Sequence, residues 1–102
     1  MGQNVVDEWV AQLSATHKAN SVLQRDEAIR SASLAAMTLM LAAPGMGLSS
    51  CPMNGFDVGQ VSQAFNLDPI VPPVIIVTVG YAASGNWPQK PRRALTEVLS
   101  IV

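Results

Sequence analysis

The sequence predicts a single α+β domain over residues 1–102, mostly helical, with one or two strands. Three observations predict it: two long stretches with helical spacing of apolar residues, one β-branched run in the second half, and a length of 102 residues. That length is near the small end of the range in which one hydrophobic core stabilises itself. We therefore expect one domain at most.

Two long helices are expected in the first half of the chain. Over residues 4–16 apolar side chains recur every three or four positions, as in an amphipathic helix with one packed face. The stretch His17–Gln24 lacks a clear period and is expected to be a connection, with helical structure within it left open. A second helix is expected to begin near Asp26, whose charge suits a helix N-terminus. After Ser33 this helix is apolar nearly all round, so it should be the central helix of the assembled fold and suits a helix–helix dimer interface.

The glycines that follow admit two interpretations. The segment Gly45–Ser50 contains glycines spaced somewhat like a dinucleotide-binding loop. That fingerprint follows a strand and opens a helix, whereas these glycines, together with Pro44, close a helix. Helix termination is the favoured interpretation.

Three shorter elements are expected in the second half. Asp57 should cap a helix over Asp57–Asn66, and a last helix is expected from Pro91 to about Ser100. Between them, the β-branched run Val74–Val79 has almost no polar alternation, which is typical of a strand buried on both faces of a sheet. A lone buried strand needs neighbours for its backbone groups. The sheet is therefore expected to be completed by another polypeptide or by a longer parent protein.

The composition supports the same conclusion. Charged residues make up 13% of the chain and hydrophobic residues 49%, against roughly 25% charged residues in an ordinary soluble domain. So small a chain has too little interior to hide this apolar surface. We infer that much of the surface is buried against another chain or against a missing part of the same fold.

Several classes of partner and location are disfavoured by charge and cysteine content. A net charge of −1 provides no field that would attract nucleic acid or membrane lipid. The apolar run Leu34–Leu48 falls short of the ~20 residues that a spanning helix needs, and no signal-peptide pattern is found at the start. The single cysteine, Cys51, is compatible with a reducing cytoplasm, where we expect the protein.

Two segments are candidates for binding chemistry. Ser49–Asp57 is polar and turn-prone, with Pro52 fixing one backbone torsion and Gly55 permitting close approach of a ligand. Such a loop can lay backbone N–H groups along a flat heteroaromatic edge, the alternative being an ordinary interhelical loop. Lys90-Pro-Arg-Arg93 places three cations at the expected start of the last helix. A phosphate would offset the positive helix terminus there, the alternative being a solvated basic turn.

Other chemistries find less support. Cys51 could be a nucleophile only beside a base, and the sole histidine, His17, lies in an unplaced connection. A buried thiol is the ordinary interpretation. No cluster of His, Cys and carboxylates has metal-ligand spacing, so no metal site is expected.

Five motifs in order resemble the C-terminal half of nitroreductase-family flavoproteins, from about Ala28 to Val102. They are Ala35-Ala-Met-Thr-Leu-Met-Leu-Ala-Ala43, Gly45-Met-Gly-Leu48, Ser50-Cys-Pro-Met-Asn-Gly-Phe-Asp57, Val74-Ile-Ile-Val-Thr-Val-Gly-Tyr81 and Lys90-Pro-Arg-Arg93. The resemblance implies a nitroreductase-like fold in which two intertwined subunits share two FMN sites. Members of the family are about twice this length, and the Arg-Ser-x-Arg-type and Asn-x-Gln-Pro-Trp-type motifs of their N-terminal half do not occur here.

The resemblance also implies functional residues. Pro52, Met53, Asn54 and Gly55 correspond to the loop beside the isoalloxazine ring, with a backbone N–H near Asn54 facing its N5 side. Lys90 and Arg92 correspond to the residues that bind the ribityl phosphate. The implied activity is NAD(P)H oxidation through FMN with reduction of a nitroaromatic, quinone or similar acceptor. Expected partners are a second copy or a second polypeptide that supplies the missing half; a non-catalytic dimerisation module is the alternative function.

Overall fold

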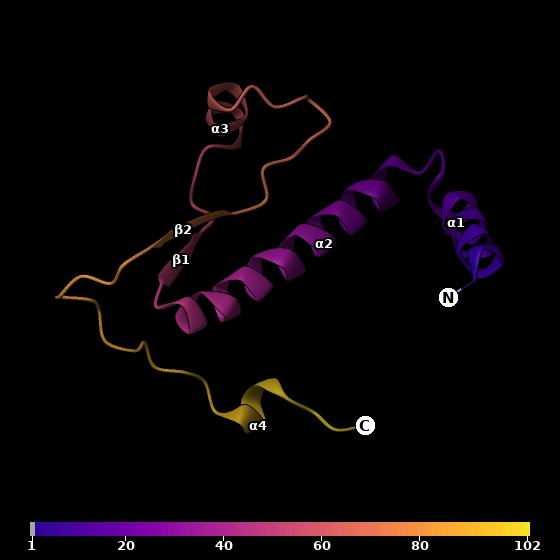
Figure 1. Cartoon of the computed structure of the whole chain (residues 1–102). Helices are drawn as coiled ribbons and strands as arrows, with labels where there is room; N and C mark the ends of the chain where they lie inside the picture. The colour runs from indigo at the N-terminus through magenta and orange to yellow at the C-terminus, as the bar shows by residue number, and fades with distance from the viewer. Residues whose placement is uncertain (1) are drawn as a thin grey trace.

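The computed structural model describes residues 2–102 of the protein (Figure 1). Helix α1 spans Gln3–His17 and α2 spans Ser21–Ala42, followed by a 3-10 turn over Ala43–Met46. Strand β1 is Ser49–Met53, helix α3 is Val58–Ala64, strand β2 is Ile76–Gly80 and helix α4 is Leu95–Val98. The mostly helical α+β class predicted from the sequence is confirmed.

Helix α2 begins five residues before the expected start at Asp26. The side chain of Asn20 accepts a hydrogen bond from the backbone N–H of Leu23 at 3.0 Å, so Asn20 is the N-cap. Such a cap supplies one of the partners that the first turn of a helix lacks. The connection is therefore shorter than the expected stretch His17–Gln24: most of that stretch is helical, and only residues 18–20 separate α1 from α2.

The end of α2 agrees with the sequence. The α-helix stops at Ala42, and Pro44 lies in the tighter turn that follows. Gly47 adopts a left-handed conformation with φ of 73°, which glycine reaches without steric cost. Its backbone N–H donates to the carbonyl of Pro44 at 3.0 Å. These glycines lead from a helix into a strand, so helix termination is the correct interpretation.

The two strands form an antiparallel ladder, with Ser49 opposite Gly80, Cys51 opposite Thr78 and Met53 opposite Ile76. Strand β2 lies within the predicted run apart from Gly80, but β1 was expected to be a loop. The segment Ser49–Met53 holds no β-branched residue and contains a proline, so propensity alone disfavours a strand there. Pairing with β2 decides its conformation.

Of the two short helices, α3 agrees with its prediction and α4 is shorter than predicted. Helix α3 is capped as predicted, because the carboxylate of Asp57 accepts from the N–H of Gln60 at 2.8 Å. Helix α4 has only four residues instead of the ten expected from Pro91. Helices this short are marginal unless another element packs on them, and the residues of α4 are exposed.

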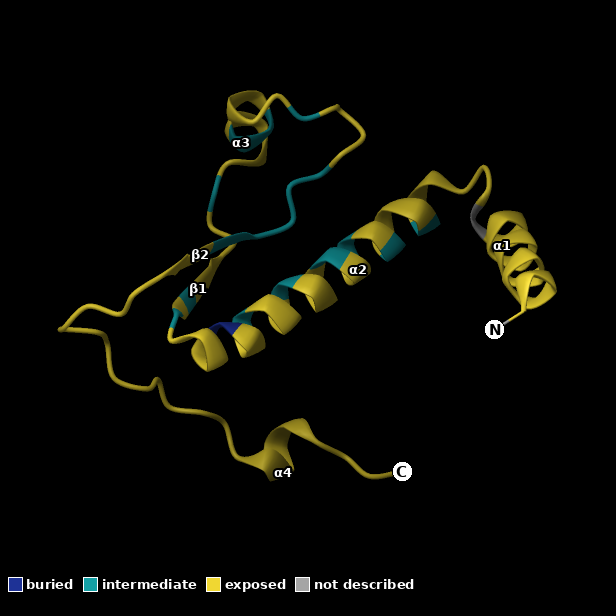
Figure 2. Ribbon diagram, viewed as in Figure 1, coloured by how far each residue is buried: buried dark blue, intermediate teal, exposed yellow. Residues whose placement is uncertain are grey.

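Helix α2 is covered along one side only. Ala32, Ala36 and Met40 are half-buried and Ala43, at 4% exposure, is the one buried residue in the described chain. Figure 2 shows this stripe facing the sheet and the segment before β2. The opposite side keeps Leu34 and Leu41 two-thirds exposed. Within this chain, α2 is therefore not covered on several sides, and the end of β2 is exposed rather than buried on both faces.

The exposed area shows how little core the chain forms by itself. It exposes 8995 Å², whereas a compact monomer of its mass would expose about 5,500 Å². Its radius of gyration is 18.7 Å, against about 13 Å for a compact domain of this length. This excess agrees with the expectation from the composition that the chain cannot hide its apolar residues by itself.

One helical stretch, Ser21–Met46, is long and apolar enough to cross a membrane by length and composition. Core helices of soluble proteins meet the same criteria. This stretch is longer than the apolar run Leu34–Leu48, from which a membrane-spanning helix was disfavoured, so length does not exclude such a helix. The absence of a membrane partner stays a prediction.

Candidate functional site

A hollow lies beside the loop that follows β1. It has a volume of ≈ 420 Å³ and is lined by Met53, Asn54, Gly55, Phe56 and Ile76. Three of the four residues predicted beside a flavin ring thus lie together on one surface. Pro52, the fourth, precedes them in β1 and does not line the hollow.

Two of the residues that line this hollow carry backbone donors without a partner in the described chain. Within residues 2–102, the N–H groups of Asn54 and Gly55 donate to no other group of the chain. A Cβ added at Gly55 would meet nothing within 4 Å, so the space beside its main chain is open. Donors without a partner need water or a ligand to satisfy them. The loop can therefore hydrogen-bond the polar edge of a flat molecule.

Apolar side chains complete the same hollow. Phe56 and Ile76 are both half-buried and were not among the predicted site residues. Phe56 belongs to the quoted motif, so the sequence held a signal for it. Ile76 lies 23 positions after Met53, and only the pairing of Met53 with Ile76 in the ladder brings the two together. Together they give the donors an apolar surface on which an aromatic ring can pack.

The cap of α3 fixes the far end of the loop. Asp57, the N-cap, follows Phe56 directly and accepts from Gln60. The loop is thus held between the last ladder pair, Met53 with Ile76, and the first turn of α3. Four residues between two fixed ends leave the Asn54 and Gly55 amides few alternative directions.

The basic cluster lies elsewhere. The loop after β1 leaves the sheet beside Ile76, whereas the segment that carries Lys90 and Arg92 leaves it from Gly80, at the opposite end of the ladder. Figure 1 shows this segment running away from α3 toward α4. Neither Lys90 nor Arg92 lines the hollow beside Gly55. The structure therefore does not bring the two predicted halves of the site together within this chain.

The local setting of the cations also differs from the prediction. Ala94 is the N-cap of α4, so Lys90 and Arg92 precede the helix instead of opening it. The argument from a positive helix terminus is therefore wrong here. Arg93 donates from Nε to Glu97 at 3.2 Å. Lys90 and Arg92 form no ion pair or hydrogen bond with the described residues, so both remain available to an anion.

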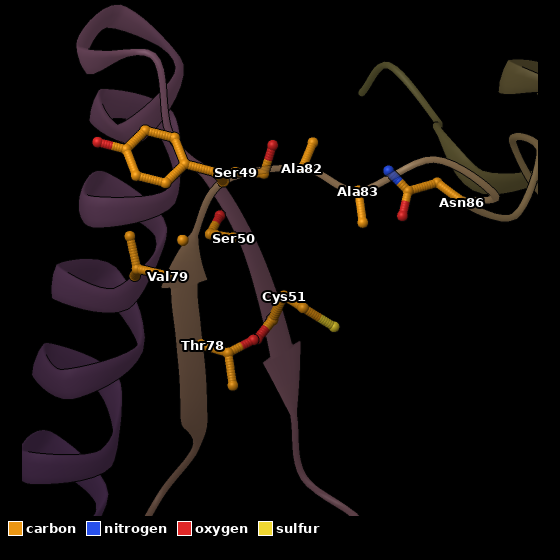
Figure 3. Close-up of a pocket in the computed structure, with 10 residues that line it drawn as sticks. Ser49, Ser50, Cys51, Thr78, Val79, Ala82, Ala83 and Asn86 are labelled. Atoms are coloured by element: carbon orange, nitrogen blue, oxygen red, sulfur yellow. The ribbon is translucent and has the colours of Figure 1, made fainter.

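A second hollow, of ≈ 670 Å³, lies at the Gly80 end of the ladder. Its lining includes Ser50, Cys51, Thr78 and Asn86, shown in Figure 3. Cys51 is exposed, so the expectation of a buried thiol is wrong. His17 is the last residue of α1, and its side chain lies outside the described part of the structure.

Comparison with known proteins gives the family. The model of the nitroreductase family matches residues 3–81. This chain belongs to the nitroreductase family. MhqN of Bacillus subtilis (strain 168), assigned as an NAD(P)H nitroreductase, is 47% identical over 57 residues, which are 56% of this chain and 28% of MhqN. The protein DrgA of a Synechocystis strain is 42% identical over 65 residues, 64% of this chain and 31% of DrgA.

Solved nitroreductases show the same fold. The structure of ydfN from Bacillus subtilis, assigned as a nitroreductase, matches with a TM-score of 0.86 at 32% identity, covering 100% of this chain and 50% of that one. A protein of Exiguobacterium sibiricum, assigned as a nitroreductase and crystallised in complex with FMN, matches with a TM-score of 0.83 at 24% identity. That match covers 99% of this chain and 49% of that protein. The chain therefore spans about half the length of these structures, and it is a partial nitroreductase fold.

Proposed function

We propose that this chain supplies part of the FMN site of an NAD(P)H-dependent oxidoreductase. The observation that carries the proposal is the pair of unpartnered N–H groups of Asn54 and Gly55 beside the apolar surface of Met53, Phe56 and Ile76. This combination fits a flat ring with a polar edge. The FMN in the solved Exiguobacterium protein and the names of relatives such as MhqN support the assignment.

Each part of the site has a defined task in this proposal. The loop amides hydrogen-bond the N5 side of the isoalloxazine ring, and Pro52 and Met53 hold that loop at the end of β1. Lys90 and Arg92 bind the ribityl phosphate as paired charged donors. Bound FMN would supply the redox chemistry, hydride transfer from NAD(P)H followed by reduction of a nitroaromatic, quinone or similar acceptor. The protein binds and orients the cofactor, and no side chain of this chain is required as an acid or base.

A second polypeptide completes the site in this proposal. The chain exposes about 3,500 Å² more than a compact monomer of its mass, and the apolar face with Leu34 and Leu41 is uncovered. A second copy, or a chain carrying the N-terminal half of the fold, would cover this face and place the flavin at the interface. We place the assembly in the cytoplasm, where an exposed thiol such as Cys51 stays reduced.

The proposal is tested on the 102-residue chain isolated under native conditions with any chain that copurifies. Absorbance near 450 nm, an FMN-dependent rise in melting temperature and NAD(P)H oxidation with a quinone acceptor are measured. We expect all three. Material that is colourless, gains no stability from FMN and oxidises no NAD(P)H would overturn the proposal.

A second function is favoured by one observation, the near absence of a core. A non-catalytic dimerisation or interaction module would need the exposed α2 face and no flavin. A stable oligomer that binds no FMN would select this function. Oxidation of NAD(P)H by the isolated assembly would exclude it.

A further inference from the structure

Thr78 is the one polar residue in the run Val74–Val79. Valine has the same branched shape and a similar preference for strands, so the fold of β2 does not by itself call for a hydroxyl at this position. The hydroxyl does have a partner. Its Oγ1 donates to the backbone carbonyl of Cys51 at 3.4 Å, a long separation for an O–H···O bond, across the ladder and 27 positions back in the sequence.

The carbonyl of Cys51 belongs to the peptide bond that enters Pro52. Proline has no N–H and cannot donate to the ladder. The strand ends at Met53, and Asn54 and Gly55 follow at once. The side-chain bond to the Cys51 carbonyl therefore acts three residues before Asn54, close to the point where the chain leaves β1.

We propose that Thr78 is a positioning residue for the flavin loop. Its hydroxyl fixes the peptide before Pro52, and this sets the direction in which the chain leaves β1 and presents the Asn54 and Gly55 amides. Thr78 does not line the hollow beside those amides, so it acts through Cys51 and Pro52 and not by touching the ring. The role in cofactor binding rests on the proposed FMN site; the ordering of the loop does not.

Three variants test this role. Thr78→Val removes the hydroxyl and keeps the branched shape, while Thr78→Ser keeps the hydroxyl and removes the methyl. Thr38→Val is the matched control, because the Thr38 hydroxyl also donates to a backbone carbonyl, that of Leu34 at 2.9 Å, but within α2. The dissociation constant for FMN, the reduction potential of bound FMN and the ¹⁵N order parameters of the Asn54 and Gly55 amides without FMN are measured.

We expect Thr78→Val to raise the dissociation constant about three- to tenfold, to shift the reduction potential and to lower both order parameters. Thr78→Ser should stay within twofold of the unchanged chain, and Thr38→Val should change none of the three. Order parameters that Thr78→Val leaves unchanged would overturn the inference, as would Thr78→Ser behaving like Thr78→Val. If the unchanged chain binds no FMN, the proposed function fails, and the order parameters alone still decide whether Thr78 positions the loop.

Discussion

Replacing Lys90 and Arg92 together with alanine tests the phosphate half of the proposed site. Neither side chain has a hydrogen bond or ion pair with the described residues, so the change removes no such interaction from that part of the chain. A hydrogen bond to a charged group contributes about 1.5–3 kcal/mol. We therefore expect the double variant to lose at least about 2 kcal/mol of FMN binding, which is roughly a 30-fold rise in the dissociation constant.

Arg93→Ala provides the matched control. Arg93 is a neighbouring cation of the same cluster, but its Nε donates to Glu97, and the side chains are 72% and 55% exposed. A surface pair of this kind contributes about 0–1 kcal/mol to stability. The control should leave the dissociation constant for FMN within about threefold of that of the unchanged chain. Arg93 does not bind the phosphate in this proposal, and salt screens the attraction between an exposed charge and an anion that it does not contact.

The assay is a titration of FMN fluorescence at two ionic strengths, with circular dichroism to confirm folding. Binding by the unchanged chain should weaken as salt rises, and the double variant should show a smaller salt dependence. A folded double variant whose dissociation constant lies within threefold of the unchanged chain would refute the assignment. Lys90 and Arg92 would then belong to a solvated basic turn.

Gly55→Ala should weaken FMN binding about tenfold without lowering the melting temperature, because the added Cβ has nothing within 4 Å beyond its chain neighbours; an equal dissociation constant would contradict the loop assignment. Leu34→Asp on the exposed α2 face should shift the assembly toward single chains in analytical ultracentrifugation, whereas Val22→Asp, 69% exposed at the other end of α2, should have a smaller effect. Asp57→Ala should destabilise α3 by about 1 kcal/mol, and Asp57→Asn, which keeps a cap, should restore the melting temperature.

The ladder explains why the hollow beside Gly55 was only partly predicted. Met53, Asn54 and Gly55 are contiguous, so a turn-prone segment with a glycine was enough to propose them. Ile76 enters the hollow through its pairing with Met53. That pairing depends on the register between two strands, and the sequence of β1, with its proline and no β-branched residue, gave no sign of a strand.

The helices, too, were predicted where local sequence decides their structure and were mispredicted where it does not. The apolar spacing over residues 4–16 and the end of α2 at Pro44 are local properties, and both were predicted. The predicted start of α2 was too late. The prediction relied on the charge of Asp26 and did not consider Asn20, whose side chain caps the helix. The length of α4 was overestimated because a short helix depends on packing, which a local pattern does not report.

The sequence by itself determined the family through five ordered motifs, the helical character of the first half and the excess of apolar surface. These depend on residue type and on spacing over a few positions, so no tertiary contact is needed to detect them. The tertiary structure alone decided that Ser49–Met53 is a strand, that Ile76 joins the loop, that Thr78 reaches the Cys51 carbonyl, and that Lys90 and Arg92 leave the sheet from its other end. Each of these depends on which residues face one another across the ladder, and pairing between segments more than 20 residues apart is set by the folded chain as a whole.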